Sequence, residues 1–88
     1  MNVTELGEVQ LRFAEHLAGA VIDRFGRDLI LVPEPGGRFT IRVLAQVSPQ
    51  FFAWVFGFGD EVEILSPASV RDAFAAQLGA TEKRYAAP

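Results

Sequence analysis

Hydrophobic and polar residues alternate in two stretches of the chain, which is typical of half-buried β-strands. In Glu8–Phe13 and in Arg38–Val47 the odd-numbered residues are all apolar, while most even-numbered residues are polar. Shorter apolar runs at Asp28–Val32 and Glu61–Leu65 predict two more strands. Pro33–Gly37 combines two prolines with two glycines, so it is predicted to be a turn. The pattern therefore predicts four strands.

Segments with the periodicity of a helix lie between these strands. Ala14–Phe25 has apolar residues at every fourth position, and Gly26 follows where a helix commonly ends. Gln50–Phe56 is almost wholly apolar. It is preceded by Ser48, a favoured N-cap residue, and by Pro49, which is well tolerated in the first turn. Both segments are predicted to be helices.

A third helix is expected at the C-terminal end of the chain. Ser66 and Pro67 repeat the Ser-Pro pair, which predicts a second capped helix start. Val70, Phe74 and Leu78 then recur at a spacing of four residues, as on one face of a helix. The helix is expected to fray near its glycine at position 79 or to continue to position 85.

The predicted order of elements is β-α-β-β-α-β-α, in a single domain that covers residues 8–85. The first six elements form the split βαβ, or ferredoxin-like, arrangement. Right-handed crossovers place the first and third strands at the centre of an antiparallel sheet, with two helices on one face. The predicted fold class is therefore α+β, with an additional C-terminal helix.

Few residues in the chain are suited to catalysis. The 88 residues contain no cysteine and one histidine, His16, which lies beside an apolar helical stripe and is interpreted as a solvated or capping residue. Asp60, Glu61 and Glu63 end one element and begin the next, so a structural role is favoured over a metal site. We therefore predict no catalytic residues, no metal and no cofactor, and we expect that the protein is not an enzyme.

Three arginines are predicted to share the outer face of the sheet. RNA-recognition modules with this topology expose aromatic residues on their central strands, but here the outward positions are mostly polar. They include Arg12, Arg38 and Arg42, which could hold a phosphate or a carboxylate. The competing interpretation is that Glu63 pairs with Arg12 and that the face is only solvated.

The helix at Gln50–Phe56 carries more aromatic residues than one sheet face can bury. Phe51, Trp54 and Phe58 form one stripe on it, and a second apolar stripe lies beside this one. Either the third helix covers the surplus or a partner does. Together with outward-facing Leu44, these three aromatics are the candidate interface.

The segment Phe52–Pro67 resembles the C-terminal extension, called WCX, that follows the WYL domain in bacterial transcriptional regulators. The shared features are an apolar helix with a tryptophan, the Gly-Phe-Gly turn, an acidic residue, the short strand V-E-I-L and a proline before a helix. Val9–Ala14 resembles the first strand of that family and Ile41–Val43 its third, while Tyr85 matches a frequent terminal tyrosine. The resemblance covers roughly residues 8–85.

This resemblance implies a regulatory function. In that family a winged-helix domain binds DNA, a WYL domain senses a ligand, and the extension is associated with dimerisation and with contacts to the WYL domain or its effector. We therefore expect a bacterial, cytoplasmic module that forms a homodimer or docks on the WYL domain of the same regulator, with no membrane partner. The resemblance implies a nucleic acid or nucleotide as effector, near Arg12, Arg38 and Arg42. DNA binding would belong to upstream domains that this chain lacks, so the chain resembles a fragment or a truncated product.

Two alternatives remain open from the sequence. A stand-alone ferredoxin-like module that binds a small molecule predicts a pocket between helix and sheet. An acylphosphatase-like hydrolase would need an anion-binding loop with arginine and asparagine, but the only asparagine, Asn2, lies in the entry to the first strand. The second alternative is therefore disfavoured.

Overall fold

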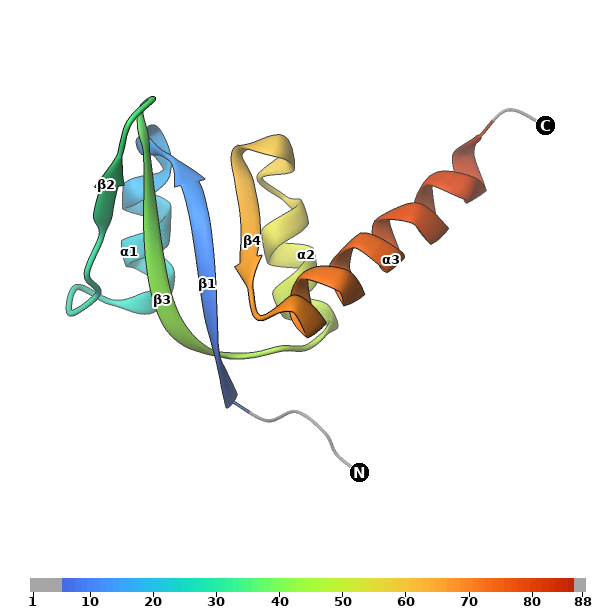
Figure 1. Ribbon diagram of the computed structural model, residues 1–88, viewed down its shortest axis with the longest axis horizontal. Coiled ribbons are helices and arrows are strands. Elements are labelled where there is room, and N and C mark those ends of the chain that lie inside the picture. The colour runs from blue at the N-terminus through green and yellow to red at the C-terminus, as the bar shows by residue number, and fades with distance from the viewer. Residues whose placement is uncertain (1–5, 87–88) are drawn as a thin grey trace.

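The computed structural model describes residues 6–86, which form an antiparallel sheet of four strands in the order β2-β3-β1-β4, together with three α-helices (Figure 1). The elements in chain order are β1 (Leu6–Ala14), α1 (Ala18–Phe25), β2 (Val32–Glu34), β3 (Arg38–Gln46), α2 (Pro49–Phe56), β4 (Val62–Ser66) and α3 (Ala68–Tyr85), with 3-10 turns η1 (Glu15–Leu17) and η2 (Gly59–Glu61). The predicted α+β, ferredoxin-like arrangement with an extra C-terminal helix is confirmed.

The central strands β1 and β3 pair along nine residues, from Leu6 opposite Gln46 to Ala14 opposite Arg38. Because side chains alternate along a strand, this register places the apolar residues of both strands on one face. The short strand β4 pairs with the other side of β1, and the register shifts between Gln10 and Leu11. The register thus separates an apolar face from a mostly polar one.

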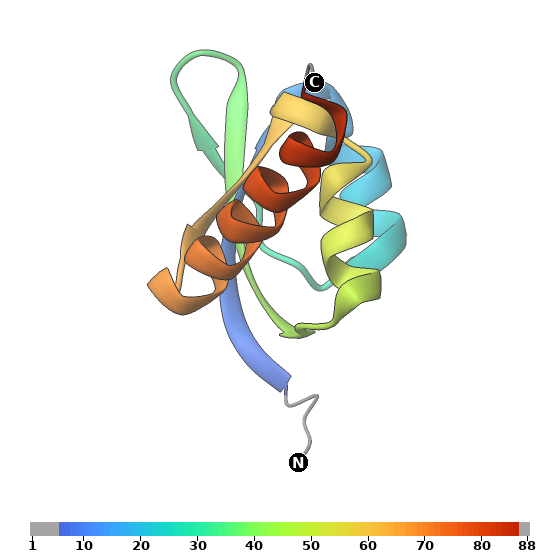
Figure 2. The same ribbon diagram turned by 90° about the vertical axis from the view of Figure 1, so that its right-hand side faces the viewer.

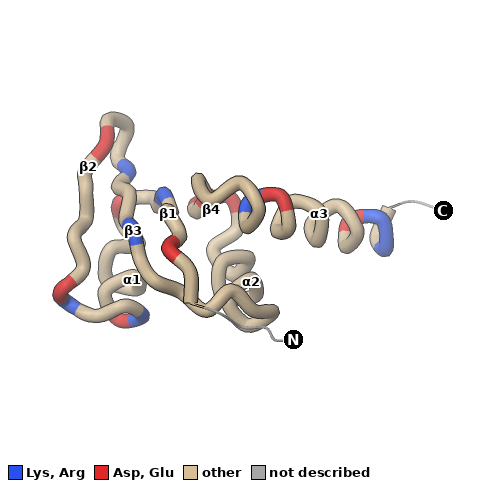
Figure 3. Tube along the Cα trace, turned by 60° about the horizontal axis from the view of Figure 1, so that its bottom comes forward, with Lys and Arg blue, Asp and Glu red and all other residues tan. Residues whose placement is uncertain are grey.

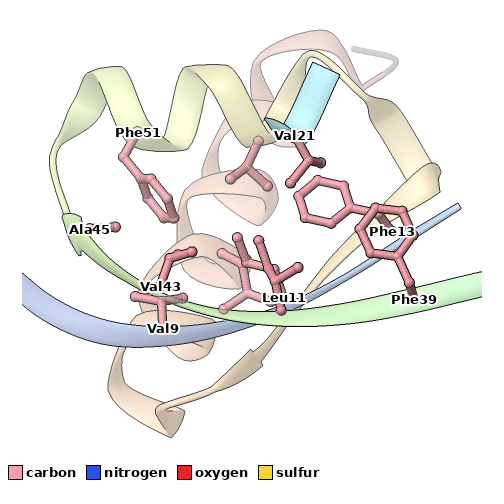
Figure 4. Close-up of a cluster of buried hydrophobic side chains, with 11 residues drawn as sticks. Val9, Leu11, Phe13, Val21, Phe39, Val43, Ala45 and Phe51 are labelled. Atoms are coloured by element: carbon pink, nitrogen blue, oxygen red, sulfur yellow. The ribbon is translucent and has the colours of Figure 1, made fainter. Parts of the chain in front are cut away.

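The core lies between the apolar face of the sheet and the helices α1 and α2, both of which cover that face (Figure 2). Figure 4 shows Val21 from α1 and Phe51 from α2 pointing toward side chains of the two central strands. The buried hydrophobic residues are Val9, Leu11, Phe13, Val21, Phe39, Ile41, Val43, Ala45, Phe51, Val55 and Ile64. Burial of a large apolar side chain contributes about 1.5–3 kcal/mol, so this cluster is the main source of stability. The opposite face of the sheet carries no helix among the described residues (Figure 2).

The second strand lies later in the chain than its apolar run predicted. The predicted strand Asp28–Val32 and the predicted turn Pro33–Gly37 are both wrong in their bounds, because β2 is Val32–Glu34 and the turn is confined to residues 35–37. β2 is an edge strand that pairs only with β3. Proline, which has no backbone N–H, is tolerated in such a strand because one side of the strand forms no ladder hydrogen bonds. The pairing of Val32 with Thr40 is the first of three residue pairs in this ladder.

Only one of the two predicted Ser-Pro caps is present. The Ser48 hydroxyl oxygen accepts a hydrogen bond from the Phe51 backbone N–H at 3.2 Å, as expected of an N-cap. The second prediction is wrong, because Ser66 is the last residue of β4 and α3 begins at Ala68 without a side-chain cap. The Ser66 hydroxyl instead donates to Gln10 Oε1 at 3.5 Å.

The first helix also begins later than predicted. Ala14 is still part of β1, and the 3-10 turn η1 precedes α1, which starts at Ala18. Gly26 ends the helix as expected. Its φ of 95° lies in a region that favours glycine.

The last helix, α3, continues past Gly79 to Tyr85 and extends away from the sheet (Figure 1). Its first half packs against the body: Val70 and Phe74 lie against the core, and the Phe74 ring lies 5.4 Å from the Phe52 ring. Among the described residues, no helix is long and apolar enough to span a membrane.

Candidate functional site on the open face of the sheet

The guanidinium of Arg12 lies between two carboxylates on the open face. Its Nε donates to Glu34 Oε1 at 2.9 Å, and its Nη1 donates to Glu63 Oε1 at 3.0 Å. The pairing of Glu63 with Arg12 that the competing interpretation of the sequence predicted is therefore confirmed, and Glu34 is an additional partner. These two carboxylates compete with an effector anion for the charge of Arg12.

This pairing extends to the last helix. Arg71 of α3 donates from Nη1 to Glu63 Oε2 at 2.9 Å and to the backbone oxygen of Ile64 at 2.8 Å. The hydrogen bond from Arg71, followed by the charges of Arg71 and Arg12, lowers the pKa of Glu63. The hydrogen bond to Glu34 is the main cause that raises the pKa of Arg12. The network links β2, β1, β4 and α3, which indicates a structural role.

Arg38 and Arg42 differ from Arg12, because both are exposed and neither has an ion pair within residues 6–86. They lie four residues apart on β3, so their Cα atoms are separated by roughly 13 Å along the strand. Two of the three predicted arginines are therefore available to an anion.

The aromatic residues of α2 are largely used inside the molecule. Phe51 is only 2% exposed and belongs to the core, so it is removed from the candidate interface. Trp54 and Phe58 are half-buried, and their rings lie 5.9 Å and 6.0 Å from the ring of Phe13. The helix also lacks charged residues (Figure 3), and two of its residues, Phe51 and Val55, are buried. Phe56, which the sequence did not single out as an interface residue, is 58% exposed.

The second apolar stripe of α2 is partly covered from within the chain. Phe52 packs against Phe74, so the third helix covers this side, as the simpler of the two sequence interpretations predicted. Leu44, the remaining candidate interface residue, is 69% exposed on the open face. Apolar surface available to a partner is therefore found at Leu44 on the sheet and at Phe56 on α2.

The lone histidine and two of the three clustered carboxylates are bound to other side chains. His16 Nε2 lies 2.8 Å from Glu61 Oε2 on the surface, and Glu63 forms ion pairs with Arg12 and Arg71. Within residues 6–86, no group of three or more potential metal ligands comes together.

A hollow of about 650 Å³ lies where the chain segment before β2 diverges from β3, and the sequence did not predict it. The segment Asp28–Ile30 borders it on one side, and Thr40 and Arg42 of β3 border it on the other. Little in the sequence indicates this hollow, because the hollow depends on where the pairing between β2 and β3 ends.

A model of the WCX domain family matches residues 5–81, which is most of the chain. A search among curated proteins finds no matching relative. The match agrees with the features described above: the apolar helix with Trp54, the short strand β4 and the helix that follows it. The chain therefore belongs to the WCX domain family, whose members form the C-terminal module of WYL-type regulators.

Proposed function

We propose that this chain is the regulatory and dimerisation module of a bacterial WYL-type, winged-helix transcriptional regulator and that it has no catalytic activity. The single observation that carries this proposal is the match to the WCX family over residues 5–81. In such a regulator, DNA binding and the main ligand-sensing function belong to the winged-helix and WYL domains. The module described here supplies contacts to a second copy or to the WYL domain.

The open face of the sheet offers a surface for a second copy. Leu44 and Leu6 are 69% and 67% exposed, and they lie diagonally across β3 and β1, since Leu44 pairs with Glu8 and Leu6 with Gln46. Exposed leucines on neighbouring strands lose contact with water if a second copy covers them. The same face on both copies would give a two-fold symmetric contact.

Leu44→Arg is expected to weaken self-association by at least about tenfold, because it places a charge at a position that the second copy would cover in the proposed contact. Multi-angle light scattering over a range of concentrations measures this effect. Phe56→Arg is the matched control, since Phe56 is an exposed apolar residue in the helical layer. A wild-type chain that stays monomeric at high concentration contradicts self-association. Dissociation caused only by Phe56→Arg would place the contact on α2.

Arg38 and Arg42 support a second element of the proposal, a contact to an anionic effector such as a nucleic acid or nucleotide. Both guanidinium groups are exposed on one strand, and neither is neutralised by a described carboxylate. Arg12 would contribute mainly by holding the neighbouring strands in place, since it forms ion pairs with Glu34 and Glu63.

Arg42→Ala is expected to weaken binding of a short single-stranded oligonucleotide about fivefold at low salt, which corresponds to the loss of one exposed ion pair. It should also reduce the salt dependence by about one phosphate contact. Fluorescence anisotropy measures both quantities. Arg84→Ala on the distant end of α3 is the control and should leave binding unchanged. Equal loss in both variants would indicate only a non-specific effect of net charge.

A stand-alone small-molecule binding module is the second candidate function. The hollow beside β3 favours it, because its volume of about 650 Å³ is typical of ligand pockets. It lies at the edge of the sheet rather than between helix and sheet.

A further inference from the structure

The hollow beside β3 exists because the edge strand β2 is short. Pairing between β2 and β3 begins at Val32 opposite Thr40, and the residues before Val32 do not pair with β3. β3 nevertheless continues to Gln46. The segment Asp28–Ile30 therefore runs beside β3 without joining the sheet, and the hollow lies between the two.

Two opposite charges line this hollow without being paired. Arg42 borders it from β3, and Asp28 borders it from the segment that follows α1. Within residues 6–86, neither side chain forms an ion pair, either with the other or with a third residue. A ligand that carries both an anionic and a cationic group can neutralise both charges at once.

Uncharged polar groups lie beside these charges. Thr40 borders the hollow and is only 5% exposed, yet its hydroxyl forms no hydrogen bond to another described side chain. A buried hydroxyl without a partner is costly, so a polar ligand atom nearby would be favourable. Gln10 lies directly opposite Arg42 and also borders the hollow. Its amide oxygen accepts from Ser66, which leaves the amide N–H groups to donate.

The remaining wall is apolar and is formed mainly by Phe25, Leu29, Ile30 and Ile41. We propose that this hollow binds a small zwitterion, an α-amino acid with a large apolar side chain. Its carboxylate bonds to Arg42 and the Gln10 amide, its ammonium pairs with Asp28, and its side chain packs against Phe25 and Leu29. This site goes beyond the proposed regulatory function, because neither the contact between copies nor the oligonucleotide contact requires Asp28 or Thr40. It rests on the second candidate function, small-molecule binding in this hollow, and names the class of ligand.

The first test compares three ligands that share one apolar body, using the full 88-residue chain. L-phenylalanine has both charges, 3-phenylpropanoate lacks the ammonium, and phenethylamine lacks the carboxylate. We expect a dissociation constant of roughly 10 μM to 1 mM for phenylalanine. We expect each single-charge analogue to bind about tenfold more weakly or worse, since each loses one charge-assisted hydrogen bond. Calorimetry gives the affinities, and NMR shift changes at the hollow locate the site.

The second test uses variants. Asp28→Asn is expected to weaken phenylalanine binding about tenfold and to leave 3-phenylpropanoate binding undiminished, because Asp28 contacts only the ammonium. Arg42→Ala should weaken the binding of both compounds. Asp72→Asn on α3 is the matched control and should change neither. Thermal unfolding verifies that each variant is folded, and Asp28 is exposed, so its substitution does not disturb the core.

Three results would overturn the proposal: no phenylalanine binding at roughly 10 mM, equal affinity for the three ligands, or equal effects of Asp28→Asn and Asp72→Asn. Failure of this proposal can be distinguished from failure of the proposed function. Arg38 contributes to oligonucleotide binding but does not border the hollow. Loss of oligonucleotide binding in Arg38→Ala with intact phenylalanine binding separates the two sites.

Discussion

Phe13→Ala is expected to lower the free energy of unfolding by about 3–5 kcal/mol, the largest effect of any substitution considered for this chain. Phe13 is fully buried on β1, and its ring lies 5.6 Å from Phe39, 5.9 Å from Trp54 and 6.0 Å from Phe58. Truncation leaves a cavity bordered by residues from β3, from α2 and from the turn that follows α2. Neighbouring side chains cannot close such a cavity without moving the sheet and α2 relative to each other.

Urea denaturation followed by far-UV circular dichroism measures this loss. A domain of this length has a total stability of roughly 4–13 kcal/mol, so Phe13→Ala is expected to be partly unfolded in water if the chain lies at the low end. Phe56→Ala is the matched control, because Phe56 is 58% exposed, and its cost should stay within about 0.5 kcal/mol. Similar losses in the two variants would contradict the position of the core.

Trp54→Ala is expected to destabilise the chain by about 2–4 kcal/mol and to leave self-association unchanged once the fraction of folded protein is taken into account. The indole packs between elements rather than on a free surface. Its ring lies 5.4 Å from Phe25 and 5.0 Å from Phe58, and the Arg24 guanidinium carbon is 5.3 Å from its centroid. An aromatic residue in this environment contributes to the stability of the fold through packing and through the cation–π contact.

This experiment separates the two roles that the sequence left open for the aromatic stripe. A core role predicts lower stability with normal association, whereas an interface role predicts weaker association with normal stability. Urea denaturation and light scattering on the same sample measure both quantities. Tyr85→Ala is the control, since Tyr85 is an exposed aromatic residue at the end of α3, and it should change neither. Weaker association without loss of stability in Trp54→Ala would return this residue to the interface.

The proposed sites divide the open face and its edge into three regions. The pair Leu44 and Leu6 lies at one end of the central strands, the exposed guanidinium groups of Arg38 and Arg42 follow along β3, and the hollow lies beside Arg42 at the edge. Arg42 is shared between the last two regions. A bound amino acid would therefore neutralise one of the two cations that an oligonucleotide could contact.

The alternation of apolar residues predicted the central strands and their buried face, because a strand with one buried face must repeat every two residues. The apolar run at Asp28–Val32 was a weaker guide. A short edge strand has no such constraint, and its bounds depend on where β3 offers a partner. Ser66 shows the same limitation: a Ser-Pro pair is compatible with a helix cap, but the pairing of Ser66 with Gln10 keeps the serine in β4.

The sequence by itself determined the order of the elements, the inward parity of β1 and β3, the Ser48 cap and the WCX family, since all of these depend on neighbouring residues or on a contiguous motif. Only the tertiary structure decided which charges are paired and which aromatics are covered. Arg12 is neutralised by Glu34 and Glu63, which lie 22 and 51 positions away along the chain. Trp54 likewise packs against Phe13 and Phe25, which are distant from it along the chain. Such contacts depend on strand order and helix placement, because residues that are distant in sequence meet only once the chain has folded.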